Sequence, residues 1–272
     1  MGDLPTQRVH GFTRPFAASG IDYAGPLTKA VHLELVTELT TEAFLAALSR
    51  FTARRGVCSQ LFSDNATNFV GAARELKEIY EFLEKEKTEI ETTLANQRVQ
   101  WNFIPPRAPN FGGLWEAAVK VAKRHLNTIT RGRTLTYEEY NTLLTEIEAI
   151  MNSRPLTPLS SDPADLAVLT PSHFLIGDSM IQPVQRDLSE VPDNRLSRWQ
   201  HLQKLRQTFW HRWQTEYLQE QQKRSKWTND GKNIELDTLV LLEEDNLSPL
   251  QWAIGRIIEL FPGPDGVVRV VT

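Results

Sequence analysis

Three carboxylates in this chain stand at positions from which they could act together on a phosphodiester. Asp22 ends the apolar run of SGIDYAGPL, Asp64 ends that of CSQLFSDNATNF, and Glu116 lies in the first turns of a helix predicted after PPRAPNFGG. Hard oxygen ligands of this kind suit Mg²⁺ or Mn²⁺ rather than zinc. Two such ions about 3.5–4 Å apart activate a nucleophile and stabilise the leaving oxygen. The three acids therefore predict metal-assisted chemistry if the fold brings them together.

Each of these residues also has an ordinary structural explanation. An Asp after a strand is often a turn former or a helix cap, and 34 acidic residues offer many sets of three. Asn65 and Asn68, which follow Asp64, either shape its loop and contact nucleic acid or cap the next helix. The residue types alone leave both explanations open.

The composition excludes several other kinds of site. Cys58 is the only cysteine of the chain, so there is neither an internal disulfide framework nor a multi-cysteine zinc site. No apolar run approaches about 18 residues, the length that indicates a membrane span. The first residues lack the apolar core of a secretory signal.

Charge is distributed unevenly along the chain. The net charge of −4 argues mildly against nucleic-acid binding. However, residues 120–133 contain five basic residues and no acid, and residues 192–233 contain nine basic residues against four acids. Residues 234–272 contain two Arg against seven acids. Local basic faces are therefore expected on an acidic chain.

Alternating strand and helix patterns must position the three acids. Hydrophobic periodicity and helix caps predict strands at residues 16–23, 30–36, 57–62 and 99–104, and helices between Thr40 and Gly56, over residues 69–88, and from Gly112-Gly113 to Leu126. The strand at residues 30–36 follows from alternation, with apolar Val31, Leu33 and Leu35 on one side. This order of elements predicts a three-layer α/β domain.

The helix that carries Glu116 also carries a basic stripe. Lys120, Lys123 and Asn127 follow Glu116 at i+4, i+7 and i+11, so the four residues share one face. With Arg124, the two lysines either grip DNA phosphates beside a catalytic acid or form a solvated face with a Glu–Lys pair.

The second half of the chain predicts a helical and then a β-rich part. A capping box at Thr136 and Glu139 begins a helix that breaks at residues 152–155, and residues 153–192 are loop-rich with a short helix at 171–176. A long helix over residues 194–224 precedes strands within 236–272. The helix's aromatic residues either bind DNA by stacking or pack against these strands, and their helical spacing favours packing.

Long motifs in this chain resemble the integrase region of BEL/Pao-type LTR retrotransposon polyproteins. They include SGIDYAGPL, AVHLELVTELTTEAFLAALSRFTARRG, SDNATNFVGAARELK, IPPRAPNFGGLWEAAVKVAKRHL and EAIMNSRPLTPLSSDPADLAVLTPSHFLIGD. The resemblance implies a ribonuclease-H-like core with a mixed sheet, in which Asp22, Asp64 and Glu116 match the metal-binding catalytic acids. It implies Mg²⁺ or Mn²⁺ as cofactor and element and target DNA as partners. It also implies 3′-end processing, strand transfer, a homo-oligomer and a nuclear, otherwise cytoplasmic, location.

The resemblance also implies a division of the chain. Residues 1–15 would be a linker remnant, residues 16–155 the integrase catalytic core, and residues 156–192 a loop-rich connection. Residues 193–272 would hold the C-terminal helix and a small, incomplete β domain similar to an SH3-like barrel.

The chain departs from the family at several points. A hairpin strand that follows the first acid in the family is missing, so the AVHLEL strand is expected to pair directly with the Asp22 strand. Ala66 stands where the family usually has Gly, and Asn110 where it usually has His. No counterpart of the family's zinc-binding N-terminal module is expected within these residues. These departures leave an alternative to the active enzyme: a catalytically dead or domesticated remnant that binds nucleic acid or protein.

Overall fold

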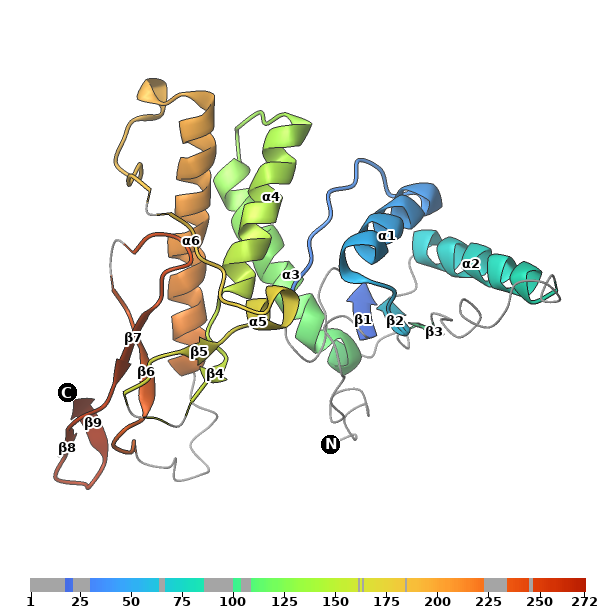
Figure 1. The fold of residues 1–272 in the computed structure, drawn as a ribbon. Coiled ribbons are helices and arrows are strands. Elements are labelled where there is room, and N and C mark those ends of the chain that lie inside the picture. Colours follow the sequence, from blue (N-terminus) through green and yellow to red (C-terminus); the bar gives the residue numbers. More distant parts are fainter. Residues whose placement is uncertain are drawn as a thin grey trace. The chain divides into compact units, whose positions relative to one another are not determined.

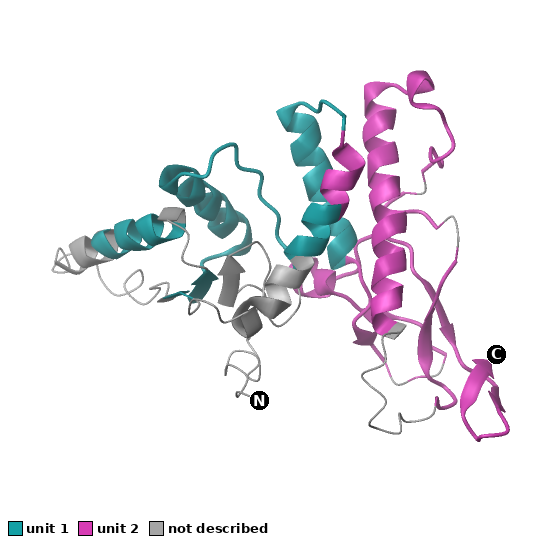
Figure 2. Ribbon diagram, turned by 180° about the vertical axis from the view of Figure 1, so that it is seen from behind, with its two compact units in different colours: residues 1–124, 132–152 teal, residues 125–131, 153–272 magenta. Residues whose placement is uncertain are grey.

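The computed structural model is an α/β protein with helices and small sheets (Figure 1). It describes residues 18–21, 30–63, 67–85, 100–103, 109–160, 162, 164–183, 185–222, 234–244 and 247–272. The chain divides into two compact units (Figure 2). Unit 1 comprises residues 1–124 and 132–152, and unit 2 comprises residues 125–131 and 153–272. No helix in the described part is long and apolar enough to cross a membrane.

Unit 1 contains a three-stranded sheet of β1 (Ala18–Ile21), β2 (Gln60–Ser63) and β3 (Gln100–Phe103). The strands lie in the order β1-β2-β3, and both pairs are parallel. A parallel pair requires a crossover connection, and the chain between β2 and β3 includes such a helix. The described strands therefore do not form the mixed sheet that the family resemblance implied.

Two helices of unit 1 pack against each other over an apolar cluster. Helix α1 (Thr41–Arg55) is capped by Thr40, whose Oγ1 accepts a hydrogen bond from the Ala43 amide at 3.1 Å. It ends at Gly56, which has a φ of 84° that favours glycine. Helix α2 is Thr67–Lys85. Buried residues of α1, β2, α2 and the preceding loop form the cluster: Phe44, Cys58, Leu61 and Ala72. The predicted cap, stop and helix are therefore confirmed.

Helices α3 (Pro109–Thr130) and α4 (Tyr137–Asn152) follow the sheet. Helix α3 begins earlier than predicted, because Pro109 takes a position in the first turn that suits proline. The two glycines at 112 and 113 lie within the helix and not in a turn before it. The predicted capping box of α4 is present: the Thr136 amide donates to Glu139 at 2.8 Å, and the Glu139 amide donates to Thr136 at 3.2 Å.

The strand predicted at residues 30–36 is wrong. Only Val31 forms a bridge, and residues 32–36 are not in a strand. The backbone is paired instead by side chains of α4, since Asn152 bonds both the amide and the carbonyl of Val31, and Glu148 accepts from the Leu33 amide. In the described part of unit 1, β1 is therefore paired with β2 and not with this segment.

The described part of unit 2 contains the long helix α6, two short helical segments and three pairs of short strands. Its elements are β4 (Thr157–Pro158), β5 (Val168–Leu169), α5 (Pro171–Ile176), η2 (Asp193–Arg195), α6 (Arg198–Gln222), β6 (Leu239–Leu242), β7 (Ala253–Arg256), β8 (Leu260–Pro262) and β9 (Val268–Val271). The described strands form three separate antiparallel pairs, β4-β5, β6-β7 and β8-β9. An SH3-like barrel thus stays a prediction.

Phe209, Trp210 and Trp213 of α6 are buried inside unit 2, as the packing interpretation predicts, whereas Trp199 is 56% exposed. Trp210 is fully buried and donates from Nε1 to the Leu247 carbonyl at 3.0 Å. The Trp252 ring contacts the rings of Trp210, Trp213 and Tyr217 at centroid distances of 5.0, 5.7 and 5.4 Å. Such ring contacts stabilise the unit beyond the area that they bury.

Candidate functional site

The carboxyl ends of β1 and β2 lead to the first two candidate acids. Ile21 is the Cα partner of Ser63, and Ser63 is the partner of Phe103 in β3. Asp22 and Asp64 are the next residues along the chain after Ile21 and Ser63. Both acids lie outside the described residues. The structure therefore describes the paired strand ends that precede the two acids and not the carboxylates.

Glu116 belongs to the backbone of α3, seven residues after Pro109. Its side chain lies outside the described part of the chain. Asn65 lies outside the described residues altogether, and Asn68 is placed only as backbone in the first turn of α2. That the predicted catalytic side chains lie close together therefore stays a prediction.

For the basic residues of α3 that follow Glu116, the structure describes how exposed the side chains are. Lys120, Lys123 and Arg124 are exposed, whereas Val119 and Ala122 of the same turns are buried. An exposed basic face is required of a phosphate-binding surface, and it is equally the ordinary state of lysine and arginine. Both interpretations of the stripe therefore remain.

No cluster of three or more His, Cys, Asp or Glu side chains that could hold a metal ion occurs among the described residues. Asp22, Asp64 and the Glu116 side chain lie outside these residues. The described part of the molecule thus offers no competing metal centre to the predicted one.

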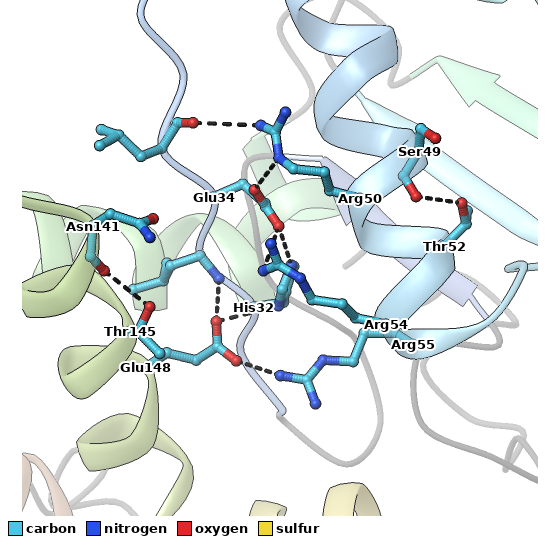
Figure 3. Close-up of polar contacts among 12 residues, drawn as sticks. His32, Glu34, Ser49, Arg50, Thr52, Arg54, Arg55, Asn141, Thr145 and Glu148 are labelled. Carbon is cyan, nitrogen blue, oxygen red and sulfur yellow. Dashed lines mark hydrogen bonds and ion pairs between the residues drawn. The ribbon is translucent and has the colours of Figure 1, made fainter. Parts of the chain in front are cut away.

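A buried polar cluster joins α1, α4 and the segment at residues 30–35 (Figure 3). The Glu34 carboxylate, whose side chain is only 6% exposed, lies 2.9 Å from Arg50 Nε and 2.9 Å from Arg54 Nη1. The Arg50 guanidinium also donates to the Leu35 carbonyl at 3.4 Å. Two cations from the last turns of α1 therefore neutralise one buried carboxylate.

Glu148 of α4 is the second buried carboxylate of this cluster. It accepts hydrogen bonds from the Leu33 amide at 2.8 Å and from Arg55 Nη2 at 2.5 Å. His32 Nδ1 lies 3.2 Å from Glu148 Oε2, the oxygen that also accepts from the Leu33 amide. Burial by itself raises the pKa of Glu148, but the contacts with His32, Leu33 and Arg55 outweigh it, so the pKa is lowered.

Only part of this polar cluster has a local signal in the sequence. His32 and Glu34 alternate with Val31, Leu33 and Leu35, so the strand pattern places them on the polar side. The helix dipole by itself favours basic residues at the end of α1. Glu148 lies on the same face of α4 as buried Leu144, at i+4. A charged residue within that apolar stripe was the signal that it has a buried partner.

Comparisons with known proteins give one family match, to the C-terminal part of the chain, and a weak similarity to a solved structure. Residues 197–272, which hold α6 and β6 to β9, match a family described as "Family of unknown function (DUF5641)". No curated protein matches the chain. Among solved structures, the chain is similar to one chain of an assembly described as a simian T-cell lymphotropic virus intasome in complex with PP2A regulatory subunit B56 gamma, with a TM-score of 0.38 and 13% identity.

That similarity covers 90% of this chain and 66% of the viral assembly's chain, slightly less than two thirds of its length. A likeness with so low a TM-score carries no argument about activity. The family match covers less than a third of the chain and has no assigned function. The protein is therefore an α/β protein whose last 76 residues, from 197 to 272, match a family of unknown function.

Proposed function

We propose that this chain is an integrase-type polynucleotidyl transferase that acts on DNA with a divalent metal ion. The observation that carries the proposal is the pairing of Ile21 with Ser63 at the ends of two adjacent parallel strands. Because parallel strands run in the same direction, the residues that follow this pair leave the sheet at the same edge. Asp22 and Asp64 are those residues.

The third acid is supplied by the helix after β3. Phe103 is the partner of Ser63, so β3 ends at the same edge, and the chain continues from there towards α3 with Glu116. Three carboxylates with no nitrogen or sulfur ligand fit Mg²⁺ or Mn²⁺. The bound metal would supply activation of the attacking oxygen and stabilisation of the leaving oxygen. The role of the three acids is to hold it in a fixed geometry.

The substrate in this proposal is DNA, held by the exposed basic face of α3. Lys120, Lys123 and Arg124 follow Glu116 by one to two turns, so phosphates bound by them would lie along the same helix as the third acid. Lysine and arginine contacts to phosphates position a nucleic acid without reading its sequence. The motifs shared with BEL/Pao-type integrase regions support this choice of substrate and a multimeric enzyme.

One observation favours a second candidate, a DNA- or protein-binding module without turnover. Residues 32–36 do not form the strand that would pair with β1, and their backbone is held by Glu148 and Asn152 of α4 instead. Among the described strands, β1 pairs with β2 alone. The fold can then persist while the catalytic geometry is lost.

Purified full-length protein, incubated with Mn²⁺ or Mg²⁺ and end-labelled duplex oligonucleotides, distinguishes the two candidates. The proposed enzyme nicks or joins the strands, and Asp64→Asn and Glu116→Gln abolish this activity while leaving the unfolding transition unchanged. Asp178→Asn is the matched control, because Asp178 is an exposed acid outside the proposed site. Protein that binds the duplex but never cleaves it supports the binding module, and protein that does neither contradicts both the enzyme and a DNA-binding module.

A further inference from the structure

Four neighbouring side chains of α6 hold a segment with little regular secondary structure. This segment, the strap, comprises residues 185–193, of which residues 185–188 are in neither a helix nor a strand. The side-chain amide of Gln207 pairs with the main chain of the strap. Its Oε1 accepts from the Leu188 amide at 2.9 Å, and its Nε2 donates to the Arg186 carbonyl at 2.9 Å. Gln207 is only 4% exposed, so water competes little for these two bonds.

The other three side chains of α6 contact the strap on either side of this pair. Lys204 Nζ donates to the Val191 carbonyl at 2.7 Å. Gln185 Oε1 accepts hydrogen bonds from Arg206 Nη2 and from Gln203 Nε2. Arg206 is only 2% exposed, and a buried guanidinium requires such acceptors. The helix therefore binds the strap near both of its ends as well as in its middle.

Leu188 is the one buried residue of the strap. It is 3% exposed, whereas Arg186, Asp187 and Glu190 are exposed. Asp187 shapes the chain around this leucine, because its Oδ1 accepts from the Ser189 amide at 2.9 Å and from the Ser189 hydroxyl at 2.6 Å. These contacts have the form of peptide recognition, in which main-chain hydrogen bonds give affinity and the burial of particular side chains gives specificity.

The two partners in this contact lie on opposite sides of a family boundary. The family match begins at residue 197, so the four side chains of α6 lie within it and the strap lies before it. We propose that α6 is a recognition surface for an extended segment of a partner protein, with a leucine as anchor and a glutamine three residues before it, and that the strap occupies this surface in this chain. The surface is independent of the proposed enzyme, because none of its residues belongs to the proposed metal site.

The strap is suited to exchange with such a partner segment. A hydrogen bond within a protein replaces one to water, so its net contribution to stability is small. Leu188 is the one buried apolar side chain of the strap, and a segment with few buried apolar contacts opens more readily than a packed core. A segment in the same chain competes at an effective concentration of about millimolar. A free segment therefore binds weakly until the strap is released.

A labelled synthetic peptide with the sequence of residues 185–193 tests the proposal on the full chain, with fluorescence anisotropy as the measurement. Leu188→Asp places a charge at the buried anchor, so the strap leaves α6. This variant is expected to bind the peptide at least about tenfold more tightly than the unchanged chain, in which the strap competes. Adding Gln207→Leu to Leu188→Asp weakens binding at least about tenfold. Adding Gln219→Leu instead, at an exposed position of the same helix, leaves binding intact.

Amide hydrogen exchange of the same variants shows whether the strap has been released. The amide of residue 188 is expected to exchange at least about tenfold faster in Leu188→Asp and in Gln207→Leu than in the unchanged chain, and at the original rate in Gln219→Leu. If Leu188→Asp does not fold, Leu188→Ala takes its place, since it removes the anchor without burying a charge.

Three results overturn the proposal. The first is a folded variant at position 188 whose strap is released but which does not bind the peptide, and the second is one whose strap amides stay protected. The third is binding that Gln207→Leu does not weaken. The assay contains neither metal ion nor DNA, so its failure leaves the proposed enzyme untouched, and the failure of the enzyme leaves this surface untouched.

Discussion

The side-chain amide of Asn152 forms a complete pair of hydrogen bonds with the backbone of Val31. Its Oδ1 accepts from the Val31 amide at 2.8 Å, and its Nδ2 donates to the Val31 carbonyl at 2.7 Å. Both residues are fully buried, and they are 121 positions apart in the sequence. The last residue of α4 therefore does for Val31 what a neighbouring strand does in a sheet.

Asn152→Ala is expected to lower the free energy of unfolding by about 2–4 kcal/mol. The substitution leaves a buried amide and a buried carbonyl without partners, and each costs about 1–3 kcal/mol. Asn152→Asp keeps the acceptor and loses the donor, so it separates the two bonds. Chemical denaturation followed by circular dichroism measures the effect.

Asn141→Ala is the control for this prediction, because Asn141 is exposed on the same helix. Its effect is expected to stay within about 0.5 kcal/mol, as for other surface substitutions. Equal destabilisation by the two alanine variants would show that the Val31 bonds contribute nothing.

This relationship explains where prediction from sequence succeeded and failed. The caps at Thr40 and Thr136 were predicted because capping depends on residues within one turn. The alternation of Val31, Leu33 and Leu35 indicates an extended backbone with one side buried, but it does not reveal what pairs with that backbone. The partner is a side chain from a distant helix, which no local pattern records.

The candidate site shows the same limit. Asp22 and Asp64 are predicted at the ends of the apolar runs around residues 16–23 and 57–62, and the described strands β1 and β2 end at Ile21 and Ser63, one residue before each acid. The buried cluster around His32 was not predicted, since its charges come from segments separated by up to 116 positions, from His32 to Glu148. Local periodicity places a residue on a face, whereas long-range ion pairs depend on tertiary packing.

Gly71→Ala is expected to destabilise unit 1 by about 1–3 kcal/mol, the usual cost of overpacking. A Cβ at position 71 would lie 2.5 Å from Thr41 Oγ1, in the contact between α2 and the first turn of α1. One helix must therefore shift or the Thr41 side chain must turn. Thermal unfolding of the variant measures the cost.

The double variant Thr41→Ala/Gly71→Ala tests the cause of that cost. Removal of Oγ1 gives the new methyl group room, so the double variant is expected to be more stable than the sum of the single effects. Gly255→Ala is a contrasting control, because its Cβ would make an ordinary 3.4 Å contact with Leu242 Cδ1. Additive effects of the two substitutions would exclude the Thr41 contact as the cause.

Glu148 is expected to make stability depend on pH on the acid side. Its pKa in the folded protein is below the ordinary value of 4.5, so the unfolded chain binds the proton more tightly. Its contribution is therefore present above pH 4.5 and is lost as the pH falls through the folded pKa. The slope of unfolding free energy against pH should be smaller in Glu148→Gln than in the natural chain.

Glu138→Gln is the matched control for Glu148, as Glu138 is exposed in the first turn of the same helix. This variant should keep the full acid slope. If Glu148→Gln also keeps it, the contacts with His32, Leu33 and Arg55 do not favour the charged carboxylate.

Replacement of Lys120 and Lys123 distinguishes a DNA-binding stripe on α3 from a solvated face. Each lysine that contacts a phosphate adds about 0.9 to the magnitude of the slope of log K against log salt for duplex DNA. Lys120→Gln/Lys123→Gln is therefore expected to weaken binding for all sequences alike and to reduce the slope by about 2. Lys77→Gln, an exposed lysine of α2, should leave the slope unchanged. Fluorescence anisotropy of a labelled duplex at several salt concentrations measures the slopes. An unchanged slope in the double variant means that the two lysines belong to a solvated face of the helix that does not contact DNA.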